Sequence, residues 1–175
     1  MGRKVFLIGL PGSGKSTIAC LLADRLDWKL VSTDTLVATQ LGLPRHSALI
    51  SAGEEHYRQV EREIMHALLT DNPPEDIIVD CGSGALDNPL TLRELQELPD
   101  REIIELVIDS ATMADRAGLN RPRSLGLGMP RTWLRKMGQA RRENWKILQA
   151  LPLEVSNLSV EQVVKKVMAA LGIKD

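Results

Sequence analysis

The chain has 175 residues, and its 22 lysines and arginines against 23 acidic residues give a formal net charge of −1. This balance excludes a generally basic nucleic-acid coat protein and an acidic disordered tail. The length fits one domain, for which about 100–200 residues are common, and we expect a single domain over residues 1–175. The positive charge is nevertheless uneven, because the stretch 116–142 holds seven arginines, one lysine and no acid.

Apolar periodicity and turn residues divide the chain into alternating strands and helices. In chain order the pattern predicts a strand at 5–8, a helix at 15–26, a strand at 29–31, a helix at 34–41, a loop or short helix at 43–52, a long amphipathic helix with a buried stripe at 57–69, a strand at 77–79, a helix at 90–98, a strand at 103–108, a long loop at 110–130, a helix at 132–151, a strand at 153–155 and a helix at 159–171. Asp34 and Ser159 are expected to cap the helices that they begin. The alternation predicts an α/β fold, with a parallel sheet covered by helices on both faces.

Two features bear on the compartment. Cys20 and Cys81 lie in apolar sequence contexts and do not make a disulfide framework, which is typical of a reduced, cytoplasmic protein. No apolar run in the sequence approaches the roughly 20 residues that span a bilayer. We therefore expect a cytoplasmic protein with no membrane partner.

The strongest motif is Gly9-Leu-Pro-Gly-Ser-Gly-Lys-Ser16, between a predicted strand and a predicted helix. It matches the P-loop pattern, in which backbone N–H groups wrap phosphates at a helix N-terminus. The lysine of such a loop reaches the β and γ phosphates, and the serine hydroxyl ligates Mg²⁺. The complete pattern disfavours an accidental glycine-rich turn, and the absence of an Asn-Lys-x-Asp signature disfavours a GTPase. The predicted nucleotide-binding residues of this loop are Pro11, Gly12, Ser13, Gly14, Lys15, Ser16 and Thr17.

The landmarks after this loop resemble the shikimate kinase family in their order and nearly in their spacing. They are Ser32-Thr-Asp34 after the second strand, Gly53-Glu54 followed by Tyr57-Arg58 and Glu61, Gly82-Ser83-Gly84 after the third strand, Arg121-Pro122, and Arg141 four residues before Trp145. The resemblance implies a P-loop kinase fold with a five-stranded parallel sheet, a substrate-binding region at about 34–62 and a mobile lid at about 111–130. It also implies ATP-dependent phosphorylation of shikimate to 3-phosphoshikimate in aromatic amino-acid biosynthesis, with ATP and Mg²⁺ as cofactors.

The same resemblance assigns roles to single residues. Asp34 would contact the acceptor hydroxyl and could take its proton, so that Lys15, Asp34 and Arg121 form the catalytic set. Arg121 and Arg116 would reach the nucleotide from the lid. The implied substrate-binding residues are Asp34, Arg58, Gly82, Ser83, Gly84 and Arg141. Arginine suits this role, because its planar fork pairs with a carboxylate.

Three positions depart from the family pattern. Ser32 replaces an acid that helps to hold Mg²⁺, and we hypothesise that Asp80 at the end of the third strand supplies the displaced carboxylate. The predicted metal-site residues are therefore Ser16, Ser32 and Asp80. Ser83 replaces a glycine at the substrate turn, and Arg123-Ser124 replaces two leucines in the lid.

These departures leave alternatives open for the function. A related kinase could act on gluconate or another hydroxylated acid, or a catalytically weakened homologue could only bind nucleotide. The basic stretch at 116–142 could face nucleic acid, but its position is better explained by a lid, and we expect a monomer with a small-molecule substrate and no nucleic-acid partner. No role is assigned to Arg123, Arg131, Arg135, Lys136 and Arg142.

Overall fold

The computed structural model describes residues 2–109, 111–112 and 131–174, and it contains a five-stranded sheet. The strands are β1 (Lys4–Ile8), β2 (Lys29–Ser32), β3 (Ile77–Asp80), β4 (Glu102–Val107) and β5 (Leu151–Glu154). Every pairing is parallel, as predicted. Residues Val5–Ile8 and all of β3 are buried, which is the pattern of central strands covered on both faces.

The strand order β2-β3-β1-β4-β5 places β1 at the centre of the sheet. The chain adds β2 and β3 on one side of β1 and then β4 and β5 on the other, so the crossover direction reverses beside β1. Ligands of open parallel sheets bind at the carboxyl ends of the strands next to such a reversal. The P-loop follows β1 directly and therefore lies at the edge where a ligand is expected.

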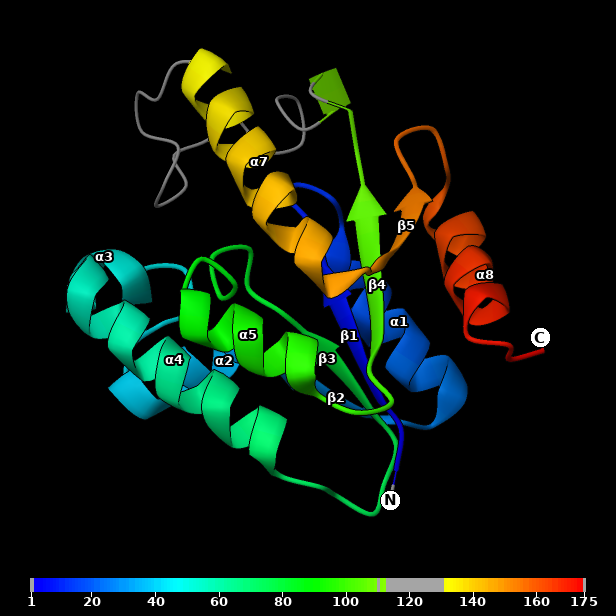
Figure 1. Ribbon diagram of the computed structural model, residues 1–175, viewed down its shortest axis with the longest axis horizontal. Helices are drawn as coiled ribbons and strands as arrows, with labels where there is room; N and C mark the ends of the chain where they lie inside the picture. The colour runs from blue at the N-terminus through cyan, green and yellow to red at the C-terminus, as the bar shows by residue number, and fades with distance from the viewer. Residues whose placement is uncertain (1, 110, 113–130, 175) are drawn as a thin grey trace.

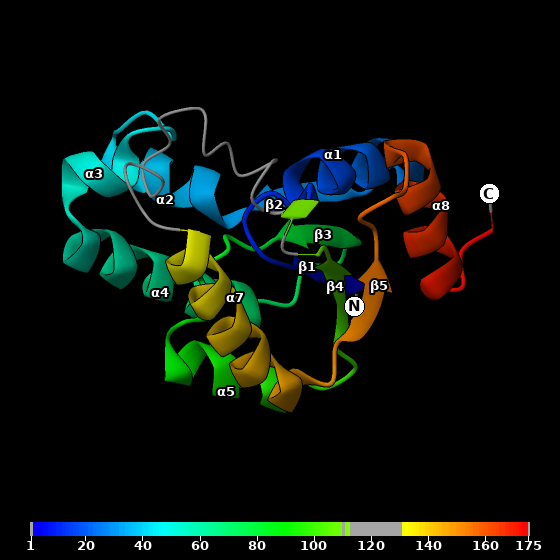
Figure 2. The same cartoon turned by 90° about the horizontal axis from the view of Figure 1, so that it is seen from above.

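Helices cover both faces of the sheet, as the sequence predicted. They are α1 (Lys15–Leu26), α2 (Thr33–Leu41), α3 (Ala48–Ala52), α4 (Glu54–Thr70), α5 (Pro89–Glu97), α7 (Arg131–Trp145) and α8 (Val160–Ala170), with a 3-10 turn at Lys146–Leu148. Helices α1 and α8 lie on one face, and α5 and α7 lie on the other (Figures 1 and 2). The main core joins the strands to α1 and α8 and includes Trp145 at the end of α7.

A second, smaller hydrophobic core lies among α2, α3 and α4. Its buried members are Val37, Ala38, Ala48, Tyr57, Val60 and Ile64. These helices stand beside the β2 side of the sheet (Figure 2), within the region predicted to bind the substrate. The second core fixes α2 and α4 against each other, and it therefore fixes the relative positions of Asp34 and Arg58, which these helices carry.

Several predicted boundaries are wrong, and two of these differences have a clear physical cause. The helix expected at 132–151 ends at Trp145, because Gln149 takes a left-handed conformation (φ 51°) and the chain then enters β5, where Leu151 pairs with Ile104. Pro152 is accommodated because β5 is an edge strand. Helix α2 begins at Thr33, so Ser32 holds the N-cap position and Asp34 lies in the first turn, where its charge still favours the helix N-terminus.

The predicted cap of α8 is confirmed, and it gives the first testable prediction. The Ser159 hydroxyl accepts a bond from the Gln162 backbone N–H, and the Gln162 side chain accepts one from the Ser159 N–H. Ser159→Ala should therefore lower the free energy of unfolding by about 1 kcal/mol, measured by urea denaturation. Ser47→Ala is the matched control, because Ser47 precedes α3 without a side-chain capping bond. An equal loss in both variants would contradict the role of the cap.

Candidate active site

The phosphate-binding loop joins β1 to α1. Gly14 takes the N-cap position of α1 with φ 88°, a conformation that side chains disfavour and that glycine adopts freely. Lys15 as a whole is 9% exposed, and its ammonium donates a 2.8 Å hydrogen bond to the Gly9 carbonyl, back across the loop. The buried hydroxyl of Ser13 has no hydrogen-bond partner among the described residues. A buried hydroxyl without a partner, next to a buried lysine on an otherwise accessible loop, suits a phosphate-binding cradle.

The charge of Lys15 is balanced by two carboxylates. Burial is the largest influence and lowers the pKa of Lys15, while the charges of Asp80 and Asp34 oppose that shift. The loop thus brings a buried cation next to two acids at the carboxyl edge of the sheet. A bound triphosphate would lie next to the positive charge of Lys15, and its counter-ion would lie next to the carboxylates of Asp34 and Asp80.

The three residues predicted to support a metal ion converge in the structure. Ser32 and Asp80 end neighbouring strands and stand in register, and the Ser32 hydroxyl donates to the Asp80 carboxylate at 3.4 Å. Burial raises the pKa of Asp80, opposed first by a hydrogen bond from Ser16 and then by the charge of Lys15. Hydroxyl and carboxylate oxygens are ligands that suit Mg²⁺, which is often held by few protein groups together with substrate phosphates. No cluster of three His, Cys, Asp or Glu side chains suited to a metal occurs in the part of the chain that is described.

Arg45 also reaches this corner of the site, and the sequence analysis missed it. Its guanidinium donates to the Ser16 hydroxyl at 3.4 Å and lies 3.6 Å from an Asp34 oxygen and 4.0 Å from an Asp80 oxygen. The side chain is half exposed and comes from the loop between α2 and α3. No local pattern around Arg45 indicates this position, because the contacts depend on how the smaller core folds the loop back over the P-loop.

Asp34 occupies the centre of the site. Its carboxylate accepts a 3.3 Å hydrogen bond from the Tyr57 hydroxyl, and burial is the main cause that raises the pKa of that tyrosine. The backbone of Gly82 passes so close that a Cβ there would collide with the Asp34 carboxylate and would lie 3.3 Å from a Glu61 oxygen. The turn after β3 therefore packs directly against the predicted catalytic acid.

Arg58 follows Tyr57 on α4. Its guanidinium donates to Glu61 at 2.6 Å, one turn along α4. A Cβ on Gly84 would stand 2.5 Å from an Arg58 nitrogen, so the turn lies against this guanidinium as well. Burial raises the pKa of Glu61, and the charge and hydrogen bond of Arg58 act against that shift. The predicted substrate residues Asp34, Arg58, Gly82 and Gly84 are thus brought together, with half-buried Ser83 between the two glycines.

Arg141 extends from α7 toward the same turn, but a residue of the chain already holds its guanidinium. Nε lies 2.8 Å from one Asp87 oxygen, and one terminal nitrogen lies 2.5 Å from the other. The charge of Asp87 also raises the pKa of Arg58, after larger influences from burial and Glu61. The sequence analysis assigned Arg141 to the substrate and did not single out Asp87. Arg116, Arg121 and Arg123, like most of the expected lid, lie outside the described residues.

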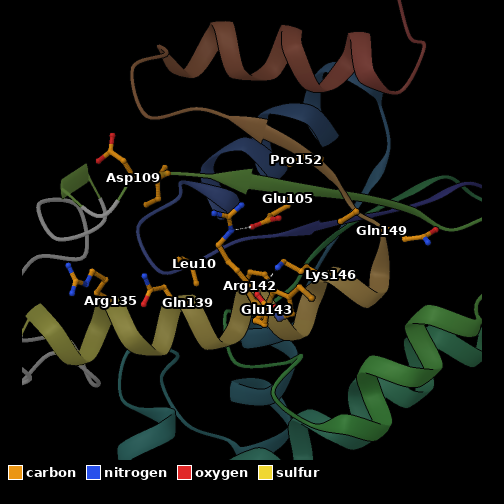
Figure 3. A pocket seen from close by; sticks show the side chains of 14 residues that line it. Leu10, Glu105, Asp109, Arg135, Gln139, Arg142, Glu143, Lys146, Gln149 and Pro152 are labelled. Carbon is orange, nitrogen blue, oxygen red and sulfur yellow. Dashed lines mark hydrogen bonds and ion pairs between the residues drawn. The ribbon is translucent and has the colours of Figure 1, made fainter.

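A separate cavity of about 810 Å³ lies between α7 and the strands β4 and β5 (Figure 3). Two of the arginines without an assigned role, Arg135 and Arg142, line this cavity. Arg142 crosses the cavity to pair with Glu105 at 2.6 Å, and Arg135 lies on its wall. Leu10 of the phosphate loop reaches the same cavity and packs against Gly138, where a Cβ would stand 2.9 Å from Leu10. Helix α7 therefore rests directly on the phosphate loop.

Comparison with known proteins identifies the family. A family model described as shikimate kinase matches residues 11–172. The chain belongs to the shikimate kinase family. The shikimate kinase of Thermobifida fusca is 31% identical over 165 residues, which are 94% of this chain and 92% of that protein. The shikimate kinase of Rhodococcus jostii is 30% identical over 173 residues, covering 98% and 99% of the two chains.

Solved structures extend the likeness to the fold of the shikimate kinase family. The shikimate kinase from Acinetobacter baumannii in complex with shikimate superposes with a TM-score of 0.82 at 19% identity, covering 98% of this chain and 94% of that one. A gluconokinase from Sinorhizobium meliloti superposes with a TM-score of 0.59 at 16% identity, covering 97% and 91%. At these identities the superpositions show the shared P-loop kinase fold, which confirms the predicted fold class.

Proposed function

We propose that the chain is a shikimate kinase, which transfers the γ-phosphoryl group of ATP to a hydroxyl of shikimate and releases ADP and 3-phosphoshikimate. Membership of the family supports the reaction class. The observation that carries the proposal for this chain is the meeting of Asp34 and Arg58 on the Gly82–Gly84 turn, beside Lys15 of the phosphate loop. A protein that only binds nucleotide has no need of a second set of groups arranged for an acidic acceptor.

The nucleotide half of the reaction falls to the phosphate loop. Its backbone N–H groups and the N-terminus of α1 would hold the phosphates, and Lys15 would leave the Gly9 carbonyl to pair with them. Phosphoryl transfer needs positioning and charge neutralisation more than covalent chemistry by the protein. Arg116 and Arg121 would add positive charge from the lid expected at about 111–130, as the family resemblance implies.

Ser16, Ser32 and Asp80 would hold Mg²⁺ and its water shell. When bound there, the ion would supply positive charge that offsets the negative charge of the phosphates. Asp80 fits the task because it is 4% exposed and accepts a hydrogen bond from the Ser32 hydroxyl. Its position supports the hypothesis that it takes over from the acid that Ser32 replaces.

The acceptor half of the reaction falls to Asp34 and the groups around it. Asp34 would accept the proton of the attacking hydroxyl, and the Tyr57 hydroxyl holds its carboxylate in place. Arg58 and Arg141 would bind the carboxylate of shikimate, with Gly82, Ser83 and Gly84 against the ring. We further propose a cytoplasmic monomer without a nucleic-acid partner. None of the described helices is long and apolar enough to cross a bilayer.

A substrate panel tests the proposal. With ATP and Mg²⁺, ADP release measured by a coupled assay should depend on shikimate, and gluconate should give at least a hundredfold lower kcat/KM, about 2.7 kcal/mol in transition-state binding. The product should be confirmed as 3-phosphoshikimate by mass spectrometry and NMR. Turnover of gluconate with none of shikimate would move the proposal to the related kinase, and release of ADP with no acid would leave only nucleotide hydrolysis.

A further inference from the structure

Asp87 pairs with the guanidinium that the proposed function assigns to the substrate carboxylate. It lies on the turn after β3 and meets the Arg141 guanidinium side-on, with one oxygen 2.8 Å from Nε and the other 2.5 Å from a terminal nitrogen. This forked geometry is the one in which arginine recognises a free carboxylate. The chain therefore presents an internal copy of the chemical group that Arg141 is proposed to bind.

The arginines proposed to bind the acid are already neutralised by acids of the chain. Arg58 pairs with Glu61, Arg141 pairs with Asp87, and the Asp34 carboxylate lies beside Gly82 on the same turn. A substrate carboxylate must either displace Asp87 or share the guanidinium with it. Displacement costs the existing ion pair, and sharing sets two like charges side by side. The charge of Asp87 weakens the binding of an acid in both cases.

The two partners differ in their freedom to move. The Arg141 side chain is 9% exposed and that of Asp87 is 41% exposed. The remaining terminal nitrogen of Arg141 is buried and has no hydrogen-bond partner among the described residues. Arg141 is therefore held by the protein interior with donor capacity to spare, while Asp87 can turn toward water when another carboxylate arrives.

We propose that Asp87 is a specificity-determining residue that competes with the carboxylate of the substrate for Arg141 and so sets the affinity for acidic acceptors. The inference rests on the proposed function, because it assumes that Arg141 binds the acid. Asp87 acts against ground-state binding of the carboxylate and takes no part in the transfer of the phosphoryl group. Its removal should therefore change the dissociation constant and KM of an acid more than kcat.

The test compares Asp87→Asn with the unaltered chain by calorimetric titration of shikimate and by steady-state kinetics. Asparagine keeps the shape and removes the charge, and the Kd and KM for shikimate should fall about tenfold, the effect of about one charge-assisted contact. The methyl ester of shikimate lacks the negative charge. Its Kd values for Asp87→Asn and for the unaltered chain should therefore differ by no more than about twofold. Glu97→Gln is the control for net charge, because it removes an exposed acid at the far end of α5.

Each outcome decides the inference. An unchanged or weaker affinity of Asp87→Asn for shikimate, or an equal gain for the ester, would overturn it and make Asp87 a support for Arg141. ADP titration of each variant checks folding, and Asp87→Ser provides a second removal of the charge. The unaltered chain tests the proposed function separately, by its turnover of shikimate. If it used another acid instead, that acid and its ester would take the place of shikimate in the same comparison.

Discussion

Asp34→Asn should lower kcat for shikimate by about 10²–10⁴-fold, the range that a positioned acid–base group contributes. Asparagine is close in shape to aspartate and keeps an acceptor for the Tyr57 hydroxyl, but it cannot take a proton from the acceptor. Stopped-flow or coupled measurement of ADP release gives kcat, and calorimetry gives the Kd values of ADP and shikimate. We expect both Kd values to change by less than about fivefold, about 1 kcal/mol.

The matched control for this substitution is Asp24→Asn. Asp24 is an exposed carboxylate on α1, away from the turn that follows β3. It loses the same charge, and its kcat should stay within about twofold of the unaltered chain, because surface substitutions rarely act at a distance. If Asp34→Asn kept more than about a tenth of kcat, Asp34 would position the acceptor without taking its proton.

The structure of the phosphate loop could be predicted from the sequence, because its determinants are contiguous. A buried strand, a glycine-rich turn and a helix N-terminus lie within residues Lys4–Leu26, and each fixes the geometry of the next. Lys15 is buried beside the loop as that pattern predicts. Local sequence therefore determines the cradle with little help from the rest of the fold.

The approach of the residues expected to hold a metal ion could be predicted for a different reason. Ser32 and Asp80 are 48 positions apart in sequence, yet each ends a parallel strand. Parallel strands bring their carboxyl ends to one edge of the sheet. An acid at the end of one strand could therefore be predicted to lie beside the serine that replaces the family's acid at the end of another. The observed register sets Ser32 opposite Asp80.

Arg45 and Asp87 escaped prediction because side-chain packing between distant elements decides what they contact. Asp87 meets Arg141 across 54 positions, through the approach of α7 to the turn after β3. Arg45 reaches Ser16 across 29 positions, from a loop with no regular pattern. Each residue places a charge beside a side chain that the sequence analysis assigned to the substrate or to the metal ion. The acid on Arg141 and the cation beside Asp34 change the electrostatics of the site without changing its motifs.

The position of Arg45 bears on the proposed role of Asp80 in binding a metal ion. A guanidinium beside Ser16, Asp34 and Asp80 partly neutralises the acids that the metal ion would use. Mg²⁺ bound by Ser16 would compete with that cation for the same oxygens, since two positive charges at this distance repel. If the proposed metal site is correct, the carboxylate of Asp80 would favour the ion over the arginine, because the neutral hydroxyl of Ser32 carries no charge to attract it.

Asp80→Asn should therefore raise the Mg²⁺ concentration needed for half-maximal turnover by about 10–100-fold, the usual effect of removing a group that orients metal ligands. The independent readout is the affinity for ADP with Mg²⁺ and with EDTA. In the unaltered chain Mg²⁺ should tighten ADP binding, and in Asp80→Asn most of that gain should vanish, while the affinity in EDTA stays within about threefold. Asp76→Asn, which removes an acid at the opposite end of the sheet beside Arg3, serves as the control. An equal benefit from Mg²⁺ in Asp80→Asn and the unaltered chain would remove Asp80 from the metal site, and the weak oxygen ligands Ser16 and Ser32 would then have to act with the phosphates alone.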